Sequence, residues 1–135
     1  MSNIDVIRRF YALPRNTAAE RGALLKLLDD DIHFVGIGKE SARGRAAIER
    51  LFQKYEGSGQ TEVSFRINHI AENGDVVLVD MVDTFTIDGK ATDIVYSNVF
   101  KVRGGRIYYW QEHYDHAALD AAFRKPIPIT ELASR

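Results

Sequence analysis

Three tight-turn signals divide the second half of the chain into four long segments, and this pattern constrains the fold more than any other feature. The turn signals are Asn73-Gly74, Asp88-Gly89 and Gly104-Gly105. Such dipeptides readily adopt the left-handed backbone that a two-residue hairpin requires. Between them apolar residues alternate with polar ones, as in half-buried strands. The segments are 63–69, 77–87, 92–102 and 107–114. Because short turns join them, we predict an antiparallel meander.

The first half of the chain has helical periodicity instead. Apolar residues from Ile4 to Tyr11 recur every three or four positions and predict a helix that ends near Pro14. A second helix is expected from a cap at Asn16 or Thr17 to Leu28, and a third between Gly44 and Gly57.

Two shorter elements complete the expected order. The acidic run 29–31 marks a break, and residues 32–37 read as a short strand. Residues 117–124 predict a helical turn before Pro126 and Pro128.

Helices first and a long meander afterwards predict an α+β fold, and the length of 135 residues matches one domain spanning 1–135. We expect a curved antiparallel sheet, a cone-shaped half barrel, wrapped around the N-terminal helices. Such a sheet encloses one internal pocket, the usual form of a small-molecule site.

Composition argues against several classes of function. The net charge of −1 does not favour nucleic acid or an anionic membrane surface, and the absence of cysteine excludes disulfides and thiol catalysis. No apolar run approaches the roughly 18 residues of a membrane span. The N-terminus mixes charged and apolar residues, unlike a signal peptide, so we expect a cytoplasmic protein.

Neither a cofactor nor a metal is expected. The glycines form no phosphate-binding loop pattern. His113 and His116 are three residues apart at the end of a strand, where they do not share a face, so they are a poor metal pair.

Asp83 is the first candidate for catalysis. It shares the period-two face of its strand with Met81, Phe85, Val79 and Ile87, which points it inward. A carboxylate in an apolar interior needs a partner or a shifted pKa. It is therefore either a catalytic acid or base, or a structural carboxyl bonded to a backbone amide or a tyrosine.

Glu112 is the second catalytic candidate. It shares a face with Tyr108, Trp110 and Tyr114, and the tryptophan favours burial of that face. In the opposite phase Gln111, His113 and Asp115 would point inward instead. If Glu112 and Asp83 both enter the pocket, they form a general acid/base pair.

Other side chains are candidates for binding a ligand rather than for chemistry. His33 lies on the short first strand, where either Ile32 and Phe34 or His33, Val35 and Ile37 face inward. The substrate-binding candidates are His33, Met81, Tyr96, Asn98, Trp110 and Tyr114.

The order of elements resembles the nuclear transport factor 2-like superfamily, especially its SnoaL-like and limonene epoxide hydrolase-like branches. The resemblance covers nearly the whole chain. The segments that carry it most clearly are 44–48, 82–85, 100–107 and 110–115. The superfamily also includes ketosteroid isomerase and scytalone dehydratase, so the resemblance implies a fold more firmly than an activity.

Residue by residue, the resemblance to known catalytic sets is incomplete. Limonene epoxide hydrolase uses an Asp–Arg–Asp set, whose Arg-x-Asp corresponds to Met81 and Asp83 and whose second Asp corresponds to Glu112. Its water-holding Tyr and Asn fall near His33 and Val35. One carboxylate is therefore kept, the second becomes Glu and the bridging Arg is absent. The proton-shuttling Asp of ketosteroid isomerase falls on Val35, which carries no proton.

Three classes of function stay open. The first is a cofactor-independent enzyme that performs acid/base chemistry on a small apolar molecule: epoxide hydrolysis, isomerisation, cyclisation or dehydration. The second is a non-catalytic binding module with the same pocket, and the third is a dimerising scaffold. Apolar residues at alternate outward positions, namely Leu78, Val82, Val95 and Val99, predict a homodimer through the convex face of the sheet.

Overall fold

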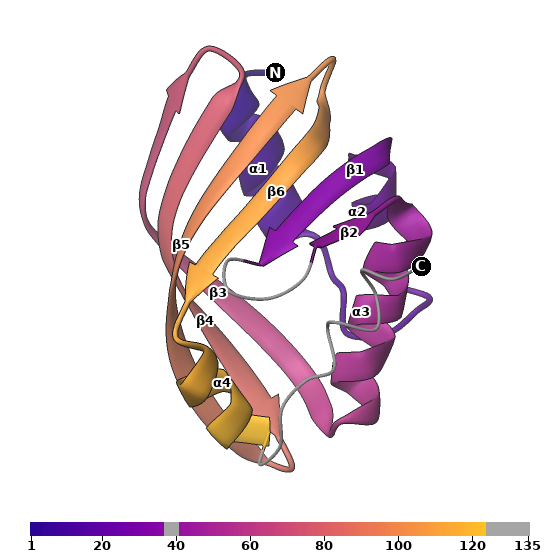
Figure 1. Cartoon of the computed structure of the whole chain (residues 1–135), viewed down its shortest axis with the longest axis vertical. Helices are drawn as coiled ribbons and strands as arrows, with labels where there is room; N and C mark the ends of the chain where they lie inside the picture. The colour runs from indigo at the N-terminus through magenta and orange to yellow at the C-terminus, as the bar shows by residue number, and fades with distance from the viewer. Residues whose placement is uncertain (37–40, 124–135) are drawn as a thin grey trace.

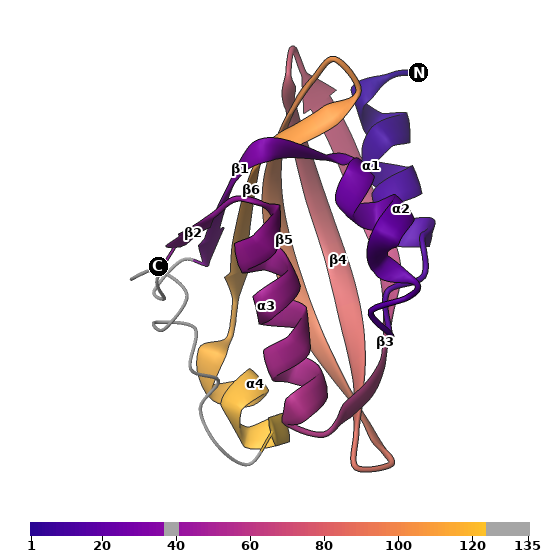
Figure 2. The same ribbon diagram turned by 90° about the vertical axis from the view of Figure 1, so that its right-hand side faces the viewer.

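The computed structural model describes residues 1–36 and 41–123. Figure 1 shows a curved sheet with helices set against it, and the view turned by 90° in Figure 2 shows α1 and α3 along the same side of that sheet. Some predicted features lie outside the described residues. They are the end of the first strand at Ile37, the end of the last helical turn at residue 124, and Pro126 and Pro128.

The helices form where apolar periodicity predicts them, with different lengths. Helix α1 (Asn3–Ala12) begins with a capping box, in which Ser2 and Asp5 each accept a hydrogen bond of 3.1 Å from the other's backbone N–H. It buries Val6, Ile7 and Phe10. The others are α2 (Arg21–Lys26), α3 (Arg45–Gly57) and α4 (His116–Phe123).

Six strands form one open sheet in the order β2-β1-β6-β5-β4-β3. Their bounds are β1 Leu28–Gly36, β2 Ser41–Arg43, β3 Gln60–Asn73, β4 Val76–Ile87, β5 Lys90–Arg103 and β6 Arg106–Tyr114. The last four form the predicted antiparallel meander. Strand β1 instead pairs with β6 in parallel. The fold is therefore α+β with a mostly antiparallel sheet, as predicted.

The second helix and the first strand meet earlier than predicted. Helix α2 ends at Lys26, and β1 already begins at the fully buried Leu28. The Leu28 carbonyl accepts two hydrogen bonds from the guanidinium of Arg45, at 2.6 and 2.9 Å. The acidic run 29–31 belongs to an irregular part of β1, where the pairing with β6 shifts register. Tertiary hydrogen bonds thus override the helical periodicity of this segment.

Two bulges change which side chains point inward. In β6 a shift of register opposite Lys101 and Val102 makes both Ile107 and Trp110 buried. Tyr108 therefore does not share the inner face, contrary to the prediction; its hydroxyl donates to Asp75 on the outside.

The second bulge lies in β3, between Ile67 and His69. It places His69 on the exterior, 2.9 Å from an oxygen of Asp80. The predicted alternation from Val63 to His69 therefore stops at Ile67.

The outer face of the sheet is partly apolar. Leu78 is 53% exposed and Val95 is 64% exposed, while Val99 is half-buried. Val82, predicted to be exposed with them, is only 7% exposed. Its cross-strand neighbours are Arg66 and Val95, whose side chains flank it on the same face.

The core lies between the helices and the concave face of the sheet. Its largest fully buried side chains include Phe10 of α1, Phe34 of β1, Ile48 of α3 and Phe100 of β5. None of the described helices, the longest of which has 13 residues, has the length and hydropathy needed to cross a membrane.

Candidate functional site

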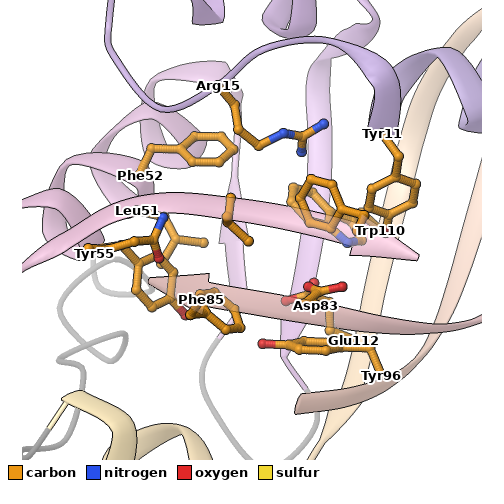
Figure 3. Close-up of a pocket in the computed structure, with 13 residues that line it drawn as sticks. Tyr11, Arg15, Leu51, Phe52, Tyr55, Asp83, Phe85, Tyr96, Trp110 and Glu112 are labelled. Carbon is orange, nitrogen blue, oxygen red and sulfur yellow. The ribbon is translucent and has the colours of Figure 1, made fainter. Parts of the chain in front are cut away.

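A pocket opens between the helices and the concave face of the sheet (Figure 3). It comprises about 500 Å³ of space, part of which is open to solvent. Most of its wall is aromatic and apolar, with two carboxyl groups and one guanidinium among the lining side chains. The lining residues are Tyr11, Arg15, Leu51, Phe52, Tyr55, Gln60, Val63, Phe65, Asp83, Phe85, Tyr96, Trp110 and Glu112.

Asp83 projects into this pocket from the middle of β4 and is 5% exposed. Its cross-strand neighbours are Phe65 on β3 and Ile94 on β5, so its surroundings are apolar. Its Oδ1 has no hydrogen-bond partner among the described residues. Burial raises the pKa of Asp83 to about 8, although the positive charge of Arg15 acts in the opposite direction.

Glu112 reaches the same pocket from β6, opposite Asn98 of β5. Burial, and after it the nearby Asp83, raises the pKa of Glu112 well above its ordinary value. The indole N–H of Trp110 acts in the opposite direction and lowers the pKa of Glu112. Its geometry nevertheless falls outside that of a normal hydrogen bond to any described residue.

The ionisation of one carboxyl group therefore affects the ionisation of the other. The second ionisation in a shared desolvated space is resisted by the charge of the first, so the pair releases its protons in separate steps. Such a pair can hold one protonated acid and one ionised base at the same time.

Arg15 is the pocket residue that the sequence patterns do not single out. It follows α1 in a loop and is 5% exposed. Its guanidinium carbon lies 4.7 Å from the ring centroid of Phe10 and 4.5 Å from that of Phe65. Nη2 donates to the carbonyl oxygen of Phe10. Burial lowers the pKa of Arg15 to about 10, so the side chain remains charged at neutral pH.

The loop that carries Arg15 is anchored on both sides of that residue. The carbonyl oxygen of Arg15 accepts a hydrogen bond of 3.1 Å from Arg21, whose guanidinium also binds Glu49 and Glu56. The next residue, Asn16, accepts a hydrogen bond of 3.2 Å from the backbone N–H of Val63, which lines the pocket. These bonds fix the position of Arg15 relative to the pocket.

Among the predicted binding residues, Tyr96 and Trp110 line the pocket. Tyr96 is 2% exposed and stacks on Tyr114 with 4.7 Å between the ring centroids. Tyr114 thus supports the wall from behind rather than lining it. Trp110 also packs edge-on against Phe10 and Phe34, so it belongs to both the pocket and the core.

Met81 and Asn98 lie just behind the lining. Met81 is fully buried, and Asn98 is 2% exposed with its amide nitrogen 3.6 Å from the Met81 sulfur. The same amide donates to the hydroxyl of Tyr11. Asn98 therefore affects the pocket through its hydrogen bond to Tyr11, which lines it.

His33 does not reach this pocket. Ile32 and Phe34 are the inward residues of β1, so His33 points to the other side. There it packs edge-on against Tyr109 and lines a separate surface hollow with charged residues such as Arg43. Burial, and after it the charge of Arg43, lowers the pKa of His33. Of the two phases left open for this strand, the structure has the one with Ile32 and Phe34 inward, so the predicted substrate-binding residue His33 does not line this pocket.

Sequence reasoning missed Arg15 because loop residues follow no period, and it used Tyr11 only as part of the apolar periodicity of the first helix. The one available signal is that Arg15 lies in a short apolar stretch around Leu13 and Pro14 with no adjacent acidic residue. Within residues 1–36 and 41–123, no cluster of three or more His, Asp or Glu side chains is arranged to hold a metal ion.

Comparison with known proteins adds a family to this geometry. A family model described as a SnoaL-like domain matches residues 7–110. Epoxide hydrolase EphG of Mycobacterium tuberculosis is 28% identical over 88 residues, which cover 65% of this chain and 58% of that protein. The chain thus spans little more than half of that relative's length.

Two solved structures show the same fold. A LEH-like epoxide hydrolase of M. tuberculosis has a TM-score of 0.71 and 22% identity, covering 90% of this chain and 89% of that one. An NTF2-like protein of unknown function from Burkholderia pseudomallei has a TM-score of 0.74 and 18% identity, covering 90% and 97%. At these identities the likeness concerns the fold alone.

Proposed function

The chain belongs to the SnoaL-like domain family, within the nuclear transport factor 2-like superfamily, and on that premise we propose that it is a cofactor-independent enzyme. Its substrate is a small, largely apolar molecule, and its chemistry is acid/base catalysis by Asp83 and Glu112. The observation that carries this proposal is the pair of carboxyl groups in one desolvated pocket, with Asp83 Oδ1 unpartnered among the described residues.

The coupling between the two carboxyls suggests their roles. Burial raises the pKa of Asp83 to about 8, and the negative charge of an ionised Asp83 favours the protonated form of Glu112, whose pKa burial also raises. We therefore assign the general base to Asp83 and the general acid to Glu112. A base with a pKa near the working pH is the most effective proton acceptor.

Epoxide hydrolysis is the reaction we place first among those open to this family. Asp83 takes a proton from water, and the water oxygen forms a bond to one epoxide carbon. The carbon–oxygen bond at that carbon breaks, and Glu112 gives its proton to the departing oxygen. The product is a diol, and both carboxyls return to their starting states through proton exchange with solvent.

Two features favour this reaction over the others. A curated relative that shares 28% identity is an epoxide hydrolase. The pocket also combines two carboxyls with a guanidinium, the same groups as the Asp–Arg–Asp set of limonene epoxide hydrolase. The guanidinium here belongs to the loop residue Arg15, since Met81 occupies the strand position where the resemblance places the arginine.

The test is turnover of a panel of apolar epoxides, such as styrene oxide and limonene oxide, with the diol measured by chromatography. Wild-type protein is expected to form diol and to incorporate ¹⁸O from labelled water. Asp83→Asn and Glu112→Gln are expected to lose about 100-fold or more in kcat while still binding ligand. The proposal fails if both variants match the wild type, or if no member of the panel is turned over.

A non-catalytic binding module is the second candidate. It is favoured by His33, which lies outside the pocket and therefore does not supply the water-holding group that the family resemblance places near it. In that case Asp83→Asn keeps the affinity for ligand, and the wild type shows no turnover to lose.

A further inference from the structure

Arg15 is a buried cation without a carboxylate partner. It is 5% exposed, and among the described residues no carboxylate oxygen lies within 4.0 Å of its guanidinium. Its Nε lacks a hydrogen-bond partner within the part of the chain that the structure describes. Removing a charge from water is costly unless a partner compensates, so buried arginines are normally paired.

The contacts that Arg15 does make hold the side chain in place without neutralising it. Its guanidinium packs on the rings of Phe10 and Phe65, and Nη2 donates to a backbone carbonyl oxygen. Cation–π contacts of this kind contribute roughly 0.5–2 kcal/mol each. A residue needed only for packing would serve equally well as methionine, which carries no charge to desolvate.

The position of the guanidinium is informative. Figure 3 shows Arg15 on one side of the pocket, with Asp83 and Glu112 on the other side of the same space. The flanking hydrogen bonds from Arg21 and to Asn16 hold the backbone on both sides of Arg15. The pocket lined by all three side chains is the space in which a ligand meets the guanidinium.

We propose that Arg15 binds a carboxylate carried by the ligand, so that the substrate is a small, flat, apolar carboxylic acid. Its carboxylate lies against the guanidinium, and its apolar body lies on the rings of Phe52, Tyr55 and Phe85. This inference rests on the proposed function, because it assigns the substrate class of the same pocket. Guanidinium and carboxylate match in shape and charge, which makes such pairs stronger than neutral hydrogen bonds.

The charge of the pocket agrees with an anionic ligand. Burial raises the pKa of Asp83 to about 8, so this carboxyl is largely protonated at neutral pH, and burial also raises the pKa of Glu112. The other titratable groups that line the pocket are Tyr11, Tyr55 and Tyr96, whose raised pKa values leave them neutral. Arg15 is the cation among these lining groups.

The test compares a matched pair of probes, phenylacetate and phenylacetamide, which differ in charge at one end. Calorimetry at pH 6.5 is expected to give wild-type protein a preference of about ten-fold or more for the acid. Arg15→Met keeps the apolar stem but should abolish the preference, and Arg15→Lys should keep part of it. Arg9→Met, at an exposed position of α1, is the control and should bind like wild type.

A measurement on the unmodified protein guards against failure of a variant to fold. Phenylacetate should shift the Nε–H signal of Arg15 in a ¹H–¹⁵N spectrum of wild-type protein, and phenylacetamide should not. Equal affinity for the two probes, no binding of either, or an unchanged preference in Arg15→Met would overturn the inference.

The test of the carboxylate site can succeed or fail independently of the test of the proposed acid/base function. A preference for the acid in protein whose turnover is unaffected by Asp83→Asn supports the carboxylate site and rejects the acid/base pair. Turnover of neutral epoxides that depends on Asp83, without any preference for the acid, supports the pair and rejects the carboxylate site.

Discussion

The side-chain amide of Asn98 donates a hydrogen bond of 2.9 Å to the hydroxyl of Tyr11. This bond joins α1 to β5, and its two residues lie 87 positions apart in the chain. Because the tyrosine oxygen accepts this bond, its own proton is available to a group in the pocket that Tyr11 lines. The pair thus places a hydroxyl donor beside the two carboxyls.

Removing that hydroxyl tests whether it serves only the fold. Tyr11→Phe leaves the buried amide of Asn98 without its acceptor, and we expect a loss of about 1–3 kcal/mol in the free energy of unfolding. We also expect kcat to fall about ten-fold if the hydroxyl positions substrate or water. Urea unfolding and turnover measure the two effects. The control is Tyr109→Phe, whose hydroxyl lies on the outer side and bonds to Gln111; it should leave kcat unchanged.

The raised pKa of Asp83 predicts how stability depends on pH. The folded protein holds a proton at this site up to about pH 8, whereas an ordinary Asp releases it near 3.8. Between these values the folded state binds more protons than the unfolded state, so the free energy of unfolding falls as pH rises. The slope from this group approaches about 1.4 kcal/mol per pH unit.

Asp83→Asn removes this contribution, because an amide resembles the protonated acid. The variant should be more stable than wild type at pH 8 and nearly equal at pH 4, as measured by urea unfolding across that range. The variant also lacks the negative charge that raises the pKa of Glu112, so the difference between the two proteins includes this coupling. An Asp83→Asn protein that is less stable than wild type at pH 8 would show that the carboxylate is stabilised by a partner.

The same ionisation governs the expected activity. If Asp83 is the base, kcat rises with pH as that group ionises near its pKa of about 8, and kcat declines once Glu112 has lost its proton. A rate profile from pH 5 to 10 measures this, at a temperature well below unfolding. A kcat that falls steadily from pH 6 to 8 would assign the catalytic role of Asp83 to its protonated form.

The sequence predicted the parts of the fold that local patterns determine. Turn dipeptides and period-two alternation placed β4 and β5 and turned Asp83 inward. Alternation also favoured an inward Glu112, and that placement agrees with the pocket although the same argument failed for Tyr108. The β6 bulge opposite Lys101 separates these two outcomes, and a bulge leaves no pattern in a single sequence.

The parts of the site that were missed depend on long-range contacts. Arg15 enters the pocket because Arg21, Asn16 and Val63 hold its loop there. His33 leaves it because β1 pairs in parallel with β6 and buries Ile32 and Phe34 on the inner side. Neither the loop position nor the phase of a short strand follows from periodicity.

The anchor of the Arg15 loop makes its own prediction. Arg21 is 1% exposed and binds Glu49 at 2.7 Å, Glu56, and the carbonyl oxygen of Arg15. Arg21→Met leaves the Arg15 carbonyl oxygen and Glu56 without this donor and removes the charged partner of Glu49, and it should cost about 1–3 kcal/mol in the free energy of unfolding. Arg45→Met is the control. Its side chain is 32% exposed, and its partners are the exposed Asp30 and the carbonyl oxygen of Leu28, so the loss should be smaller than for Arg21, which has two carboxylate partners. Similar losses would mean that the Arg21 cluster is not a special anchor.

The outer face of the sheet predicts an assembly. We propose that two copies of the chain associate through this face, since Leu78 and Val95 are 53% and 64% exposed there. Exposed apolar side chains on adjacent strands form a surface whose contact with water is unfavourable. Burial of that surface against a second copy lowers the free energy. The net charge of −1 offers little repulsion between copies.

Light scattering should therefore give the mass of two chains of 15.3 kDa each for wild-type protein. A lysine at Leu78 or Val95 would be buried without a partner in such a dimer, so Leu78→Lys and Val95→Lys should shift the mass toward one chain. Ala19→Lys introduces the same side chain at an exposed position before α2, away from the sheet, and should remain dimeric. A wild-type mass of one chain at high concentration rejects the dimer. A dimer that both sheet variants preserve places the interface on another face.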